Sequence, residues 1–282
     1  MQQIIKTTLL LALLTGLFMT IGYLAGGQSG AILAFFIAAV INFGMFWFSD
    51  KLVLKMQGAR PLQDHEHPEL VQMVRELTHA DHLPMPQLYV METPIPNAFA
   101  TGRSYKHAAV AVTTGIMEML TRDELKAVLG HELGHVKNRD MLVSTVAATF
   151  AGAIGFIAEL AFWTGGLFGG DEDDGPGAWI GTIAMIVIAP LAAMLIQMAV
   201  SRSREYLADQ HGKHLVGSGD ELASALRKLE NFKHKVGPIE PTPTQEATAH
   251  LMFTNPFSMT GLASLFSTHP STDQRVRRLL AR

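Results

Sequence analysis

Long uncharged stretches alternate with polar segments along this chain, and the first of them lies at the N-terminal end. Residues 7–49 contain no Asp, Glu, Lys or Arg, and a glycine-rich interruption at residues 26–30 divides the run into two halves of about 20 residues. An α-helix needs about 20 apolar residues to cross the hydrocarbon core of a bilayer, which is roughly 30 Å thick. A signal peptide has a shorter apolar core of about 7–15 residues. The pattern therefore predicts a transmembrane hairpin over residues 1–50.

A second hydrophobic hairpin is predicted over residues 141–201. Residues 141–163 carry a single charge, Glu159, and residues 178–201 carry none, while the segment between them is acidic and rich in glycine. The same pattern would suit a buried hairpin in the core of a soluble domain. The length of each half and the near-absence of charge favour two further membrane spans, about four in the whole chain. Glu159 would then face protein or water instead of lipid.

Charges at the ends of the two hairpins predict their orientation. Basic residues lie at the polar ends of both: Lys51, Lys55, Arg60, Lys137, Arg139, Arg202 and Arg204. The turn of the first hairpin is uncharged, and the tip of the second is acidic. Because basic residues next to spans favour the cytoplasmic side, we expect the N-terminus and both polar segments, residues 51–140 and 202–282, in the cytoplasm. These two segments would form the first and second parts of one folded domain.

The first polar segment has the pattern of a helix followed by short strands. Apolar residues spaced for one buried face predict a helix over residues 68–80, with Pro68 at its start. Residues 87–91, 97–101 and 108–113 are rich in residues that favour strands and are separated by turn residues.

The middle strand is expected at the edge of the sheet, because Pro94 and Pro96 precede it and proline is confined to sheet edges. An edge strand can bind an extended peptide as a further strand. This makes its residues candidates for substrate binding: Asn97, Ala98, Phe99 and Ala100. An ordinary structural strand is the alternative interpretation.

Composition supports a membrane protein and limits the kind of metal site. Of the 282 residues, 48% are hydrophobic and only 17% are charged, whereas soluble domains carry about 25% charged residues. The net charge of −3 gives no indication of nucleic-acid binding. The chain has no cysteine, which excludes disulfides and thiolate ligands. A metal ion in this protein must therefore be held by histidines and carboxylates.

The pattern His131-Glu132-Leu133-Gly134-His135 is the clearest chemical signal. Thr121 and Glu124 form a capping box that predicts a helix start, and no proline interrupts the chain from there to residue 140. On a helix, residues four apart lie on the same face, so His131 and His135 can bind one zinc ion while Glu132 serves as a base for water. Gly134 would let another chain or a substrate approach the helix closely.

A third ligand is needed, because a catalytic zinc usually takes three protein ligands and keeps one open position. The related pattern with a third histidine would place it at position 141, which is Met141. Among downstream carboxylates, Glu159 lies in an apolar span and Glu172 at the acidic tip, whereas Glu205 directly follows the second hairpin. A hairpin returns the chain to the side where it left, so Glu205 is the predicted third ligand.

The remaining parts of a hydrolytic site can be assigned around these ligands. Asp209 lies one turn after Glu205 and could accept the N–H of a ligand histidine, which fixes its tautomer. Glu132 would take the proton of the attacking water and pass it to the leaving amine. His269 could donate to the oxyanion, although a turn histidine before Pro270 is an equal alternative.

Together these motifs resemble the HtpX heat-shock membrane metalloproteases, bacterial relatives of the CAAX-processing zinc proteases. The similarity covers nearly the whole chain and rests on both hairpins and on residues 131–135, 204–209, 97–102 and 268–270. It implies an α+β, mostly helical fold with a cytoplasmic gluzincin-like metalloprotease domain and a small edge-strand sheet. It also implies one Zn²⁺ per subunit, with His131, His135 and Glu205 as ligands and Glu132 as catalytic base.

The resemblance further implies a physiological role. An HtpX-like protease is an endopeptidase of the bacterial inner membrane that cleaves misfolded or damaged membrane proteins and other unfolded polypeptides. It acts in stress response and quality control beside a membrane AAA protease. Two other functions compete with this interpretation.

One alternative is an intramembrane protease, but charged residues at positions 122–126 directly precede the histidine motif, whereas such enzymes carry it inside an apolar span. The other is a membrane scaffold or transporter with a structural zinc. A structural site has four protein ligands and no use for Glu132.

Overall fold

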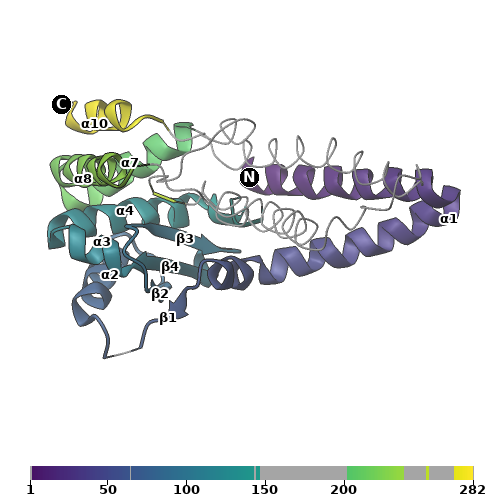
Figure 1. Cartoon of the computed structure of the whole chain (residues 1–282), viewed down its shortest axis with the longest axis horizontal. Helices are drawn as coiled ribbons and strands as arrows, with labels where there is room; N and C mark the ends of the chain where they lie inside the picture. Colours follow the sequence, from purple (N-terminus) through teal and green to yellow (C-terminus); the bar gives the residue numbers. More distant parts are fainter. Residues whose placement is uncertain are drawn as a thin grey trace.

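The described part of the chain consists of a long helical hairpin and a sheet covered by helices (Figure 1). In this computed structural model it comprises residues 2–63, 65–142, 144–146, 202–237, 252–253 and 270–281. Most of the predicted second hairpin lies outside the described residues, and so does His269. Of residues 141–201, only 141–142 and 144–146 are described, and these are helical.

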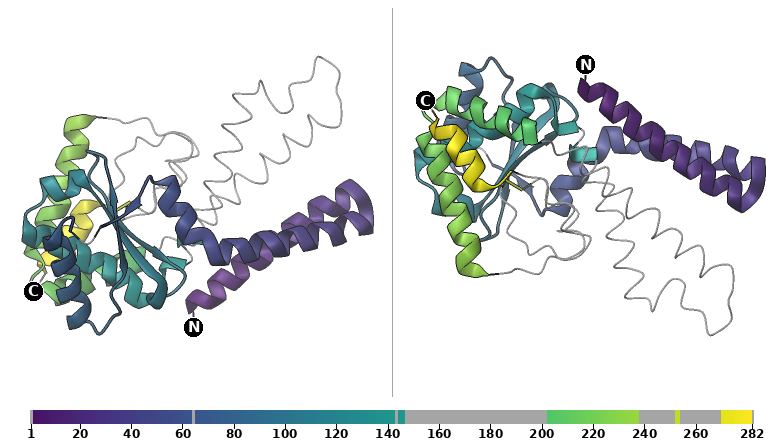
Figure 2. Two further views of the ribbon diagram at one scale, coloured as in Figure 1. Left: turned by 90° about the horizontal axis from the view of Figure 1, so that it is seen from below. Right: turned by 90° about the horizontal axis from the view of Figure 1, so that it is seen from above.

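The N-terminal hairpin is formed by helix α1, Gln2–Met56, which is broken once. Gly26 and Gly27 have non-helical backbone angles, and the φ of Gly27 is 59°, which glycine adopts without strain. The two arms lie side by side in all views (Figures 1 and 2). Asn42 joins them, since its Nδ2 donates to Thr15 Oγ1 at 2.8 Å. A helical hairpin with its turn at the predicted position is therefore present, and its insertion into a membrane stays a prediction.

The second arm of α1 has the properties of a membrane span. It is the one helix in the described residues, Gly26–Met56, that is long and apolar enough to cross a bilayer. Large apolar side chains along it are exposed, among them Phe36, Val40, Phe43 and Phe48. Such a surface suits lipid tails better than water. The number of spans in the whole chain stays a prediction.

The sheet has four strands in the order β1-β2-β4-β3. They are β1 Arg60–Pro61, β2 Gln87–Met91, β3 Ala98–Gly102 and β4 Ala108–Thr113. β2 and β4 are parallel, and the two outer strands pair antiparallel with them. The three predicted strands are confirmed, with β3 shifted by one residue and located at the edge as expected. The two-residue β1 carries too little sequence to be predicted.

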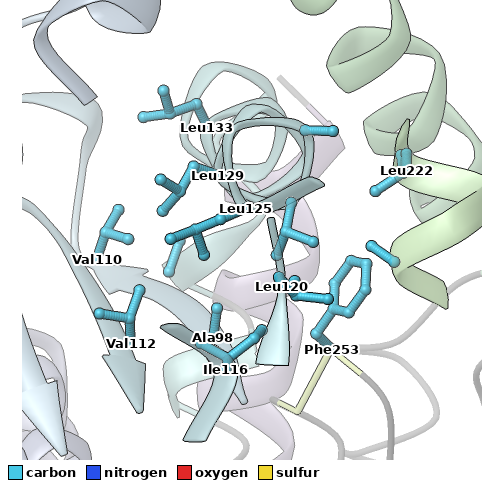
Figure 3. Close-up of a cluster of buried hydrophobic side chains, with 14 of the residues drawn as sticks. Ala98, Val110, Val112, Ile116, Leu120, Leu125, Leu129, Leu133, Leu222 and Phe253 are labelled. Carbon is cyan, nitrogen blue, oxygen red and sulfur yellow. The ribbon is translucent and has the colours of Figure 1, made fainter. Parts of the chain in front are cut away.

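Helices cover one face of the sheet and form the main core. They are α2 Pro68–Ala80, α3 Thr114–Met119 and α4 Arg122–Asn138, and α8 Asp220–Val236 packs on the far side of α4. Figure 3 shows Val110 and Val112 of β4 facing Leu125 and Leu129 of α4. Helix α2 has the predicted bounds, and the predicted capping box of α4 is present.

The opposite face of the sheet rests on the end of α1. Val53 and Leu54 pack there against Phe99 of β3 and Ala111 of β4. The alternation of side chains along a strand places Phe99 on this side and Ala98 and Ala100 on the helix side. The α1 hairpin is therefore part of the same packed body as the sheet.

Helix α4 packs very closely against α7, Arg202–Val216, along a seam of small residues. A Cβ on Gly212 of α7 would lie 3.0 Å from the backbone nitrogen of His131, and a Cβ on Gly134 would lie 3.1 Å from the Cα of Ala208. Gly130 faces Gly212 in the same way. Glycine permits this close approach because it has no side chain. The partner that Gly134 admits is α7.

We predict that Gly212→Val forces α4 and α7 apart. The added side chain overpacks a seam with no space, which should destabilise the fold by about 1–3 kcal/mol. Thermal unfolding of the detergent-solubilised chain, followed by intrinsic fluorescence, measures the shift. Gly44→Val is the matched control, because nothing lies within 4 Å of the position its Cβ would take. Equal midpoints for both variants would show that the seam is not tight.

Candidate metal centre

Helices α4 and α7 bring three predicted ligands to one point. The metal-binding atoms of His131, His135 and Glu205 all lie within 4.8 Å of one another. The Nε2 atoms of the two histidines are 3.1 Å apart, and each faces one oxygen of Glu205, at 3.8 Å from His131 and 3.6 Å from His135. Two imidazoles and one carboxylate form a donor set that zinc binds in hydrolytic enzymes.

The other nitrogen of each ring is held by a carboxylate. His131 Nδ1 lies 2.9 Å from Asp209 Oδ1, and His135 Nδ1 lies 3.2 Å from Asp140 Oδ2. Because carboxylates only accept, both Nδ1 atoms carry the proton, and the Nε2 lone pairs point to the centre. This tautomer is the one a metal ligand needs. The residues present therefore fit a bound divalent cation.

Asp140 was not identified from the sequence. It follows the end of α4, where Arg139 takes a left-handed conformation with φ 58° and turns the chain back towards His135. The N–H of Asp140 is 3.4 Å from the carbonyl of His135. Its Oδ1 is buried and has no hydrogen-bond partner within the described part of the chain. The detectable signal was a short acidic residue just beyond a helix end.

A buried arginine from the C-terminal helix completes the group around Asp209. Arg275 lies on α10, Thr272–Leu280, and is 2% exposed. Its Nη2 donates to Asp209 Oδ1 at 2.6 Å and its Nε to Oδ2 at 2.9 Å, a two-pronged contact. Nη2 and His131 Nδ1 share Oδ1 as acceptor, which explains their 3.3 Å separation. The sequence shows Arg275 four residues before the apolar Leu279, on the buried face of a short basic helix.

Phe253 lies against His131, and hydrogen bonds hold both its backbone N–H and its backbone carbonyl. Its N–H donates to Asn97 Oδ1 at 3.1 Å, and its carbonyl accepts from Arg275 Nη1 at 3.4 Å. The Phe253 ring is 5.0 Å from the His131 ring, edge to face. Asn97, predicted for substrate binding, thus uses its side-chain oxygen to fix Phe253. Sequence periodicity gave no sign of Phe253.

Glu132 contacts the edge strand through its backbone. Ala100 N–H donates to Glu132 Oε2 at 2.9 Å. This N–H points away from β4, so by alternation the backbone groups of Ala98 and Gly102 also face the outer edge, where no described strand pairs with β3. The side chains of Ala98 and Phe99 are buried in the two cores, which leaves only the backbone of β3 towards that edge.

Burial and charge shift the proton affinities in this group. Burial lowers the pKa of His131 to about 4 and raises the pKa of Glu132 to about 7. Burial also opposes charge on His135, but the charge and hydrogen bond of Asp140 outweigh it and raise its pKa to about 10. A proton on His135 Nε2, which a bound cation would displace, can then donate to His131 Nε2. The carboxylates thus favour positive charge at the point where the Nε2 atoms meet.

Comparisons with known proteins agree with this arrangement. Residues 64–282 match peptidase family M48. The protease HtpX homolog of Persephonella marina is 50% identical over 275 residues, covering 98% of this chain and 96% of that protein. The corresponding protein of a Sulfurihydrogenibium species is 49% identical, covering 99% and 96%. The crystal structure of S. mikatae Ste24p has a similar fold, with a TM-score of 0.51 at 18% identity, over 99% of this chain and 66% of that chain.

We predict that Arg275→Met weakens metal binding. Without the guanidinium, the buried Asp209 carboxylate loses its charge partner and no longer holds His131 firmly, and changes to such supporting contacts reduce metal affinity about 10–100-fold. Titration with Zn²⁺ in competition with a chelating dye measures the loss. Arg277→Met is the control, because Arg277 is exposed on the same helix. Equal affinities for the two variants would contradict a supporting role of Arg275.

Proposed function

The chain belongs to peptidase family M48, and on that premise we propose that it is a zinc-dependent endopeptidase of the bacterial inner membrane. It cleaves misfolded or damaged membrane proteins at the cytoplasmic surface as part of proteolytic quality control and the stress response. The observation that carries this proposal is the meeting of His131, His135 and Glu205, with Glu132 beside them and against an edge strand.

Zinc is the metal that this donor set fits best. Two neutral imidazoles and a carboxylate, without sulfur, are typical of catalytic zinc sites that keep a position open for water. When bound, the ion supplies Lewis acidity that acidifies water and polarises a carbonyl group. Asp140 and Asp209 hold the two imidazoles in the required tautomer. One Zn²⁺ per subunit follows from the single group of this kind among the described residues.

Glu132 acts as the general base and acid. Ala100 N–H holds Oε2, which leaves the other carboxylate oxygen to receive a proton from the attacking water. With its pKa raised to about 7 by burial, Glu132 can accept this proton and later donate it to the leaving amine near neutral pH. Burial of the site also keeps bulk water from competing for the proton.

The substrate binds along the free edge of β3 as an added strand. The backbone groups of Ala98 and the carbonyl of Ala100 are the pairing points, because the N–H of Ala100 serves Glu132. Asn97 and Phe99 contribute indirectly, through the contact with Phe253 and through packing on α1. Recognition through backbone groups suits a protease that accepts unfolded polypeptides of many sequences.

The setting in the membrane follows from the charge pattern of the sequence. Both hairpins span the inner membrane, with the N-terminus and the catalytic centre in the cytoplasm. Residues 51–140 and 202–282 form the two parts of the protease domain on either side of the second hairpin. His269 assists at the oxyanion, and a membrane AAA protease is the partner in quality control. These assignments stay predictions.

A scaffold or transporter with a structural zinc is the alternative function. A structural site would have four protein ligands, whereas three such groups meet in the described residues. The position of Glu132 next to the ligands, with its carboxylate against the β3 edge, favours catalysis. An intramembrane protease fits less well, because α4 begins at the exposed, charged residues Arg122 and Asp123.

Glu132→Gln separates catalysis from metal binding. We expect this variant to keep its zinc and to lose cleavage of a loosely folded membrane substrate by a factor of at least about 10². Glu205→Ala should instead lose most of its zinc, since one of three ligands is gone. Metal content by atomic emission and cleavage by gel assay give the two readouts.

For each variant, one result would contradict the role that we assign to the substituted residue. Full cleavage by Glu132→Gln would show that Glu132 is not the catalytic base and would favour a structural role for a zinc ion at this site. Unchanged zinc content in Glu205→Ala would remove Glu205 from the site without affecting the role of Glu132.

The topology of the second hairpin can be tested with a single cysteine. The chain has none of its own, so Glu172→Cys introduces a unique thiol at the acidic tip. If residues 141–201 span the membrane twice, a membrane-impermeant maleimide should label this thiol from the outer side of the inner membrane. Labelling from the cytoplasmic side alone would refute the second pair of spans.

A further inference from the structure

Two arginines lie over aromatic rings next to the apolar hairpin. The guanidinium of Arg103 is 4.7 Å from the ring centre of Trp47, and that of Arg139 is 4.9 Å from the ring centre of Tyr105. Trp47 belongs to α1, residues 103–107 link β3 to β4, and Arg139 ends α4. Three segments that are distant in sequence therefore meet at the base of the hairpin.

This group lies where the apolar surface of α1 ends. Lys51 follows Trp47 by one helical turn and is the first basic residue after the uncharged run. From Gly30 to Trp47 the helix rises by about 26 Å, close to the roughly 30 Å of a hydrocarbon core. The hairpin leaves the folded domain beside the end of β3 (Figure 1). The group is thus at the level of the lipid headgroups if the hairpin spans the membrane.

The basic side chains of this group have no acidic partner within the described part of the chain. Lys51, Lys106 and Arg139 are exposed, and Arg103 is half-buried on Trp47. Some basic residues elsewhere on the surface pair with carboxylates, as Arg60 does with Glu66 at 2.7 Å and Lys126 and Lys228 do at 2.6 Å. Among the described residues, four basic side chains without a carboxylate partner are therefore grouped around the base of the hairpin.

We propose that Lys51, Arg103, Lys106 and Arg139, together with Trp47 and Tyr105, form a binding surface for anionic phospholipid headgroups, here called the basic collar. A guanidinium whose face is covered by an aromatic ring still directs its N–H donors outward, in a geometry that matches phosphate oxygens. Trp and Tyr prefer the headgroup level of a bilayer, and clustered basic residues there attract anionic lipids.

The basic collar is joined to the candidate metal centre by very short pieces of chain. Arg103 is three residues after Ala100, whose N–H holds Glu132. Arg139 directly precedes Asp140, whose carboxylate holds His135. Lipid bound at the basic collar would therefore seat the catalytic centre at the membrane surface. The binding itself rests on the spanning hairpin and not on proteolysis.

Quenching of Trp47 fluorescence by brominated lipids tests the proposal. The chain has three tryptophans, so Trp163→Phe and Trp179→Phe leave Trp47 as the reporter, and Glu132→Gln prevents self-cleavage. The full chain is reconstituted in phosphatidylcholine vesicles that contain either brominated phosphatidylglycerol or brominated phosphatidylcholine. We expect a relative association constant at least about threefold higher for the anionic lipid, decreasing with salt.

Variants locate the effect. In Arg103→Gln/Lys106→Gln/Arg139→Gln, the ratio of the association constants for the anionic and the zwitterionic lipid should fall to about one. Arg227→Gln/Lys233→Gln/Lys235→Gln on α8 removes the same charge away from the hairpin and should keep the preference (Figure 1). Lys51→Gln/Lys106→Gln leaves both arginines on their aromatic rings and should lower the preference for the anionic lipid to an intermediate value. The test therefore does not depend on folding of the triple variant.

Three results would overturn the proposal. If the two brominated lipids quench Trp47 equally when the basic collar is unaltered, the basic collar does not prefer anionic headgroups. An undiminished preference in either collar variant would place the lipid contact elsewhere. Competition by millimolar soluble glycerol phosphate would identify a site for free phosphate compounds instead of a membrane surface. None of these outcomes depends on whether the chain cleaves peptides.

Discussion

The close contact between α4 and α7 is the constraint on which the candidate metal centre depends. Gly130 and Gly134 on one helix meet Gly212 and Ala208 on the other, so the two backbones approach to a distance that larger side chains would prevent. Only at this separation can Glu205 reach the two histidines of α4. The sheet, the core and the C-terminal helix support this pair of helices from outside.

Charged groups of opposite sign surround the predicted ligands in succession. The two imidazoles are each held by a carboxylate, and the carboxylate of Asp209 is held by Arg275. Although burial alone would raise the pKa of Asp209, the charge of Arg275 lowers it to about 2, so this residue stays ionised. Buried charges require such partners, because an unpaired one is strongly destabilising. Because Asp209 stays ionised and holds His131, the centre keeps a negative charge and a ligand geometry that favour binding of a cation.

Strand β3 connects this chemistry to the membrane. On one side Phe99 packs against the end of α1, and on the other Ala100 N–H holds Glu132. The loop that follows β3 carries Arg103, which lies on Trp47 of the hairpin. A single edge strand thus contacts both Glu132, the proposed base, and the apolar hairpin α1. This explains why a membrane hairpin and a peptidase domain form one packed body.

Local patterns in the sequence determined the N-terminal hairpin, helix α2, the capped start of α4, three of the four strands and the edge position of β3. Periodicity, capping and proline act over a few residues, so they can be recognised without the fold. The spacing of His131 and His135 and the position of Glu205 after a hydrophobic hairpin likewise indicated the centre. The positions of Asp140, Phe253 and Arg275 at the centre, and the contact of Asn97 with Phe253, were decided only by the tertiary structure. Their contacts depend on a helix end that turns back and on chain segments that return from more than a hundred residues away, and no local pattern records such returns.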